Sequence, residues 1–208
     1  MIEQFKTIFT EPSKFYKGVK NWSYGDVLKF LFAVALLPSV LNWYAELSAE
    51  ITQGELGEML NFPEPTLILI AILLATLSIF ISPFINSAIT HLGVLIVGGR
   101  GYKKTFLATG NALAISAAYI LVYSILGLFM LEQEHTLIAT LIIIVMLAGF
   151  IHALVTEIIG LKVLHNLSTG KAVIAAIIVP LAVVFLIGLI LITILVLLTI
   201  SLGIGGHL

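Results

Sequence analysis

Five long apolar runs divide this chain of 208 residues and limit what it can fold into. A helix needs about 20 apolar residues to cross a hydrocarbon core roughly 30 Å thick. The runs lie at 27–45, 66–97, 106–131, 137–161 and 172–203. Only 10 % of the residues are charged, whereas soluble domains carry about 25 %. The sequence therefore predicts an all-α integral membrane protein with five transmembrane helices, forming a single domain over residues 1–208.

Two of these runs are longer than a membrane requires. The runs 66–97 and 172–203 would each extend roughly 48 Å as a straight helix. Each contains a proline, Pro83 in the first and Pro180 in the second. We expect tilting, kinking or emergence into the headgroup region to absorb the excess length.

The basic residues predict the orientation of the chain. All of them lie before the first span or at its start, between spans two and three, or between spans four and five. They are Lys6, Lys14, Lys17, Lys20, Lys29, Arg100, Lys103, Lys104, Lys162 and Lys171. The loops on the opposite side, including the acidic segment 46–65, contain glutamates and no basic residue. Because Lys and Arg favour the cytoplasmic side, we place the N-terminus in the cytoplasm and the C-terminus outside.

Residues 1–26 have the pattern of short interfacial helices. Apolar side chains alternate with lysines, and Pro12 suits the first turn of a helix. The sequence "SYGD", Ser23 to Asp26, fits a capping box that opens span one. This segment either anchors and orients span one or senses lipid or a partner, and the anchor is the simpler interpretation.

The sequence "GGRGYKKTF", residues 98–106, contains three glycines and two lysines and has some likeness to a phosphate-binding loop. Such a loop needs a glycine directly before its lysine and a strand before the loop. Here Lys103 takes that glycine's position and a membrane helix precedes it, so we interpret the segment as a basic turn. Its glycines can end a helix. The attraction of each cation to anionic headgroups contributes about 1 kcal/mol to membrane binding. The predicted contact residues of this turn and the next are Gly98, Gly99, Arg100, Lys103, Lys104, Lys162 and Lys171.

The second cytoplasmic turn carries the sequence "GLKVLHNLSTGKA", residues 160–172, and an N-terminal segment reads "EPSKFY", residues 11–16. Together with the "GGRG" turn, these motifs and the spacing of the five spans resemble the Yip family of membrane proteins. Eukaryotic members bind Rab GTPases and act in vesicle budding and fusion between endoplasmic reticulum and Golgi. They usually have a long cytosolic N-terminal region, whereas 26 residues precede span one here. The resemblance is therefore to the compact prokaryotic members and implies a prokaryotic cell membrane. A small GTPase remains one partner that the family suggests.

Among the polar residues inside the predicted spans, five form a candidate intramembrane cluster. They are Asn86, His91, Asn111, His152 and Glu157. Counted from the basic turns, His91, Asn111 and Glu157 lie roughly 8 to 10 Å from the cytoplasmic side and could converge there. A carboxylate at that depth needs a partner, because ionised groups are costly in the membrane. We take His91 as the partner of Glu157.

These polar residues permit three interpretations. They can join the helices through hydrogen bonds worth about 0.6 kcal/mol each, form an ion or proton pathway, or form a switch that responds to lipid or a partner. A metal site is disfavoured because His152 and Glu157 diverge by about 140° around their helix. The chain contains no H-E-x-x-H, no G-x-S-x-G and no cysteine. We therefore expect no enzyme activity, no metal or other cofactor and no nucleic-acid partner.

The predicted function is that of a membrane organiser or adaptor. By the family resemblance, its basic turns would contact a cytoplasmic protein or anionic membrane lipids. The alternative is a small transporter or channel that uses the intramembrane polar residues. Five spans make a small translocation unit, so this alternative requires a homo-oligomer.

Overall fold

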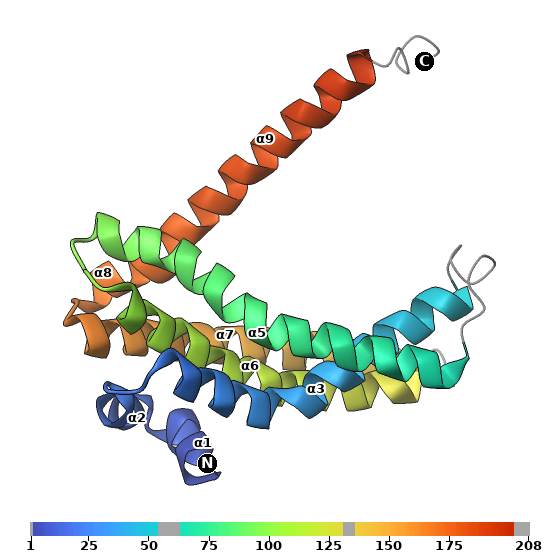
Figure 1. The fold of residues 1–208 in the computed structure, drawn as a ribbon, viewed down its shortest axis with the longest axis horizontal. Coiled ribbons are helices and arrows are strands. Elements are labelled where there is room, and N and C mark those ends of the chain that lie inside the picture. The colour runs from blue at the N-terminus through green and yellow to red at the C-terminus, as the bar shows by residue number, and fades with distance from the viewer. Residues whose placement is uncertain (1, 54–62, 131–135, 202–208) are drawn as a thin grey trace.

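The computed structural model describes residues 2–53, 63–130 and 136–201, and every regular element in those ranges is helical (Figure 1). The elements are α1 Ile2–Thr10, α2 Pro12–Val19, α3 Tyr24–Gln53, α5 Glu64–Ile96, α6 Tyr102–Met130, α7 Thr136–His165, α8 Thr169–Val173, η1 Ile174–Ile178 and α9 Val179–Ser201. Five segments are long and apolar enough to cross a membrane, namely α3, α5, α6, α7 and the stretch from α8 into α9. The predicted all-α fold with five spans is confirmed. Of the acidic segment 46–65, residues 54–62 lie outside the described residues.

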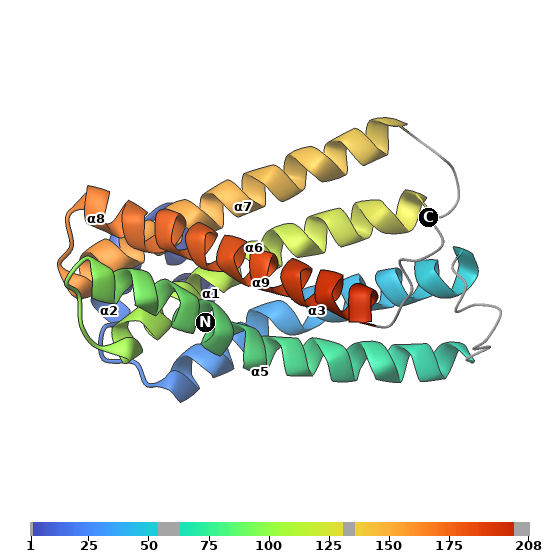
Figure 2. The same cartoon turned by 90° about the horizontal axis from the view of Figure 1, so that it is seen from above.

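Helix α6 lies at the centre of the bundle and packs against α3, α5 and α7 (Figure 2). Of the most apolar 18-residue stretch of α6, 61 % is buried, whereas the corresponding share in the other spans does not exceed 28 %. Small side chains make this position possible, since they let neighbouring helices approach closely. At the contact with α7, a Cβ on Gly149 would lie only 2.6 Å from the Cβ of Tyr119. Helix α6 is therefore the element around which the polar residues of the other spans are arranged.

Helices α1 and α2 pack against the bundle with one face. The side chains of Ile8, Phe15 and Tyr16 are buried, while the lysines of both helices are exposed. The Tyr16 hydroxyl donates a hydrogen bond of 2.9 Å to the carbonyl oxygen of Ala108 in α6. Gly160 of α7 leaves room for the ring, because a Cβ there would lie 2.6 Å from Tyr16 Cζ. Protein contacts thus hold the N-terminal helices in place, which favours their interpretation as an anchor.

The ends of the spans use local hydrogen bonds of the predicted kinds. Before α3, the Asp26 N–H donates to Ser23 Oγ at 3.2 Å, and the Ser23 N–H donates to Asp26 Oδ2 at 2.8 Å, which forms a capping box. After α5, Gly98 adopts a φ of +87°, and the Gly99 N–H donates to the carbonyl of Val94 at 2.8 Å. Glycine tolerates this left-handed conformation without steric cost, so it ends the helix sharply.

The last span changes its helical geometry where it leaves the bundle. In η1 the chain forms a π-turn, and the Val179 N–H donates to the carbonyl of Ile174, five residues earlier. Pro180 follows directly, has no N–H, and in a regular α-helix would clash with the carbonyl four residues before it. Beyond this point α9 diverges from the other helices (Figure 1). None of the most apolar 18-residue stretch of the fifth span is buried. The excess length of the fifth span is thus accompanied by a change in helical pitch and direction.

Candidate functional site

Glu157 of α7 is half-buried and joins three helices. Its Oε1 accepts hydrogen bonds from Thr90 of α5 at 3.0 Å and from Thr109 of α6 at 2.8 Å. Its other oxygen, Oε2, has no hydrogen-bond partner among the described residues. Burial, and to a smaller extent the negative charge of Glu157, raise the pKa of Tyr16 well above its ordinary value. The carboxylate is therefore held at one oxygen and unpaired at the other.

The expected pairing of His91 with Glu157 is not formed. The Nδ1 atom of His91 lies 2.9 Å from Thr105 Oγ1, which is also 3.1 Å from Nε2 of His165. A hydroxyl has one proton, so Thr105 donates to one imidazole and accepts from the N–H of the other. His91 follows Thr90 in the chain, and one residue turns a helix by about 100°, which directs Thr90 and not His91 toward Glu157.

His152 lies in a different environment from Glu157. Its Nδ1 is 3.1 Å from the Tyr119 hydroxyl, and its ring meets the ring of Phe9 edge-on at 5.1 Å. These contacts connect α7 with α6 and with the N-terminal helix α1. The described part of the chain contains no group of three or more His, Cys, Asp or Glu side chains that could hold a metal ion.

The two asparagines also have different surroundings. Asn111 is fully buried in α6, and its Nδ2 donates to the carbonyl of Leu107 on the same helix at 2.8 Å. Its Oδ1 is buried without a hydrogen-bond partner in the described structure. Asn86 of α5 is half-buried and faces a cavity that Glu157 also lines. Of the five predicted intramembrane residues, the structure thus brings Asn86 and Glu157 to one space.

This space, which we call the Glu157 cavity, has a volume of about 700 Å³ and lies between α5, α6, α7 and the start of α9. Its lining is mainly apolar. The polar residues that line it are Asn86, Thr90, Thr109, Ser116 and Glu157. A mainly apolar cavity with a few convergent polar groups is typical of a small-molecule binding site.

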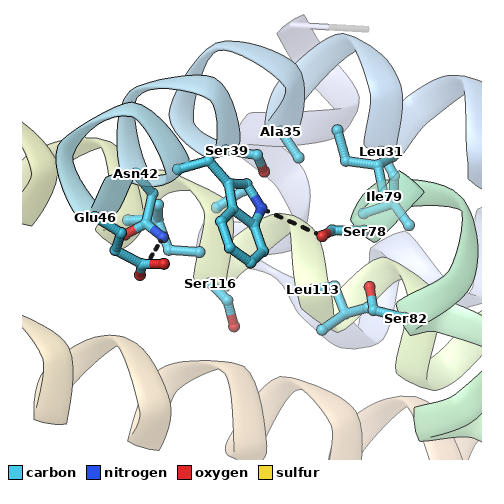
Figure 3. A pocket seen from close by; sticks show the side chains of 13 residues that line it. Leu31, Ala35, Ser39, Asn42, Glu46, Ser78, Ile79, Ser82, Leu113 and Ser116 are labelled. Atoms are coloured by element: carbon cyan, nitrogen blue, oxygen red, sulfur yellow. Dashed lines mark hydrogen bonds between the residues drawn. The ribbon is translucent and has the colours of Figure 1, made fainter. Parts of the chain in front are cut away.

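A second cavity of about 380 Å³ lies between α3, α5 and α6 (Figure 3). Among its lining residues, Asn42 Nδ2 donates to Glu46 Oε1 at 2.8 Å, and Trp43 Nε1 donates to Ser78 Oγ at 3.3 Å. Two residues of α6 line both cavities, Leu113 and Ser116. The two spaces are therefore neighbours along the central helix.

The basic residues gather at one end of the molecule, which we call the basic end. This end comprises α1 and α2, the C-terminal ends of α5 and α7, and the N-terminal ends of α3, α6 and α8 (Figures 1 and 2). All ten Lys and Arg side chains are exposed. The predicted contact residues Gly98, Arg100, Lys103, Lys104, Lys162 and Lys171 are exposed, whereas Gly99 is buried. A Cβ on Gly99 would lie 2.6 Å from Val94 Cγ1 and 3.5 Å from His165 Nδ1.

The amino-acid sequence of this five-span chain matches a known protein family. The model of the Yip1 domain matches residues 6–204, which is nearly the whole chain. The chain belongs to the Yip1 domain family. Neither the curated proteins nor the solved structures that were compared gave a match. The predicted family is confirmed, and with the five spans it identifies an integral, multi-pass membrane protein.

Several residues that bond the polar side chains of the spans were not predicted from the sequence. Thr105, which bonds both histidines, and Thr109, which bonds Glu157, were not among the predicted site residues. Their spacing of four residues places both on one face of α6 near its start, a signal that the sequence contains. His165 was also not among the predicted site residues, although its side chain is half-buried against the basic turn.

Proposed function

We propose that this Yip1-domain protein is a non-enzymatic membrane organiser that presents its basic end to an acidic surface. We predict that this end is cytoplasmic, where the acidic surface is that of a partner protein or of anionic headgroups. The observation that carries the proposal is the exposure of all ten Lys and Arg side chains at one end. Like charges gathered on one face attract an acidic partner and orient it before contact.

Two further features support a fixed contact surface. Among the described residues, the one ion pair of the basic end joins Lys14 to Glu11, so the other nine cations keep their charge available. The two turns are also joined to each other, because Thr105 bonds both His91 and His165 beneath them. The cations of the turns are therefore presented in a defined pattern and not on free loops.

Photocrosslinking at Gly170 tests this function. Gly170 lies in the second basic turn, is exposed, and has no atom within 4 Å of the position of an added Cβ. We expect irradiation of native membranes to capture one protein reproducibly, or to capture anionic lipid. The triple variant Arg100→Gln, Lys103→Gln, Lys104→Gln should lose that capture, because it removes three exposed cations. Capture that is unchanged in the triple variant would contradict a role for the basic end.

A second candidate function is a small oligomeric transporter or channel. The observation that favours it is the pair of cavities that share Leu113 and Ser116, one of them lined by Glu157. In proteoliposomes, this function predicts a pH-dependent flux that Glu157→Gln abolishes. If the polar residues only join the helices, the same substitution changes stability and no flux is present in either protein.

A further inference from the structure

We propose that the Glu157 cavity binds the primary ammonium group of a membrane amphiphile, whose hydrocarbon chain lies along the apolar walls. The inference concerns a site inside the membrane and is independent of the basic end. It rests on the unpaired carboxylate oxygen, on the other polar groups of the cavity, and on the way the cavity opens.

The Glu157 carboxylate has one oxygen without a hydrogen bond and no cationic partner among the described residues. Two threonine hydroxyls donate to Oε1 and leave Oε2 available. Among the described residues, no Lys, Arg or His side chain forms an ion pair with it. A carboxylate away from water is costly unless a cation accompanies it. A bound ammonium group would supply that cation.

The polar lining matches the donors of a primary ammonium group. Such a group has three N–H donors and no acceptor. Besides Glu157, the side chains of Asn86 and Ser116 line the cavity, and each has an oxygen that can accept a hydrogen bond. Neither side chain is hydrogen-bonded within the described structure. The rest of the lining is mainly apolar and suits a hydrocarbon chain better than a hydrated metal ion.

The rim of the cavity opens toward lipid. Phe150 of α7 and Leu181 and Val184 of α9 line it and are 66 %, 63 % and 58 % exposed. These residues belong to membrane-spanning helices, so their exposed faces meet acyl chains. Glu157 lies five residues before Lys162, or roughly 8 Å along α7 from the basic end. The headgroup of an amphiphile in the bilayer would therefore lie at a depth close to that of Glu157, and the amphiphile could enter the cavity laterally.

Native mass spectrometry of the full chain in detergent tests this site. The protein is titrated with phosphatidylethanolamine, with phosphatidylglycerol and with dodecylamine. We expect the two amines to bind and phosphatidylglycerol to bind more weakly. Glu157→Gln keeps an acceptor for the threonines and removes the charge, so it should weaken amine binding at least about tenfold. Glu46→Gln, which changes an exposed carboxylate at the second cavity, should leave binding unchanged.

A second pair of variants keeps the test valid if Glu157→Gln does not fold. Ala153→Phe fills the Glu157 cavity, whereas Ala148→Phe adds the same volume on an exposed position of α7. Loss of amine binding in Ala153→Phe alone supports the site. Binding of phosphatidylethanolamine without dodecylamine identifies a lipid as the ligand, and the reverse result identifies a free amphiphilic amine. The proposal is overturned if phosphatidylglycerol binds as well as the amines, or if Ala153→Phe and Glu157→Gln both leave binding unchanged.

Discussion

Tyr16 carries a hydroxyl from the N-terminal helix α2 into the bundle, where it bonds the carbonyl of Ala108. We expect Tyr16→Phe to lower the free energy of unfolding by about 1 kcal/mol, because a typical intramolecular hydrogen bond contributes that amount. Unfolding in a mixture of mild and denaturing detergent can be followed by the fluorescence of Trp22, whose ring lies 5.9 Å from that of Phe15. Gly18→Ala is the control, since a Cβ at this position of α2 would meet nothing within 4 Å.

The same tyrosine predicts a dependence on alkaline pH. Burial raises the pKa of Tyr16 in the folded protein, so above about pH 10 only the unfolded state releases this proton. The contribution of the neutral Tyr16 hydroxyl to the free energy of unfolding is complete below that pH. It falls as the pH rises, by up to about 1.4 kcal/mol for each pH unit. The stability difference between wild type and Tyr16→Phe should therefore shrink between pH 10 and pH 11. Equal pH slopes for the two proteins would contradict this account.

At the level of single residues, the sequence predicted depth better than direction. Glu157 and His91 were expected at similar depths, and Glu157 accepts a hydrogen bond from Thr90, the residue next to His91. Which neighbour each side chain meets depends on the rotation of each helix about its axis, and that rotation is decided by packing. The apolar residues of these spans show no strong amphipathic pattern from which to read it, because lipid and protein interior are both apolar.

At the level of elements, the crossing of α5 and η1 directs the last span. Gly93 permits this crossing, since a Cβ there would lie 2.5 Å from the carbonyl oxygen of Ala175. We expect Gly93→Ala to push η1 away and to cost about 1–3 kcal/mol in free energy of unfolding, as overpacking does. Spin labels at Leu73 of α5 and Leu191 of α9, both exposed, should then report a longer or broader distance distribution.

Gly188→Ala provides the matched control for this crossing. It makes the same substitution in α9 at a position where a Cβ would meet nothing within 4 Å. An unchanged distance distribution in Gly93→Ala would mean that α9 is directed by something other than this contact. The sequence predicted that tilting, kinking or emergence into the headgroup region would absorb the excess length of the run that contains Pro180, but it did not predict a π-turn. A π-turn depends on which carbonyl the Val179 N–H selects, and composition does not indicate that choice.

At the level of the whole molecule, the position of the basic end predicts the orientation in the membrane. The chain has no cysteine, so a single introduced cysteine is a unique label site. We expect Thr136→Cys, at the end of α7 opposite the basic residues, to react with a membrane-impermeant maleimide in intact cells. Gly170→Cys should react only after the cells are permeabilised, because Lys and Arg favour the cytoplasmic side. The reverse labelling pattern would mean that the protein is inserted the other way. Labelling of the denatured protein gives the total for each site.

The π-turn at Ile174–Ile178 has a consequence for how this sequence compares with its relatives. A π-turn contains one residue more than the α-helical turn it replaces, so it behaves as a single-residue insertion kept inside a helix. Deleting one residue here would restore regular pitch and leave the turn before it and the span after it intact. When homologous chains are aligned, gaps of one residue should therefore concentrate at 174–178. A homologue that carries such a gap should also tolerate a residue other than proline where this chain has Pro180.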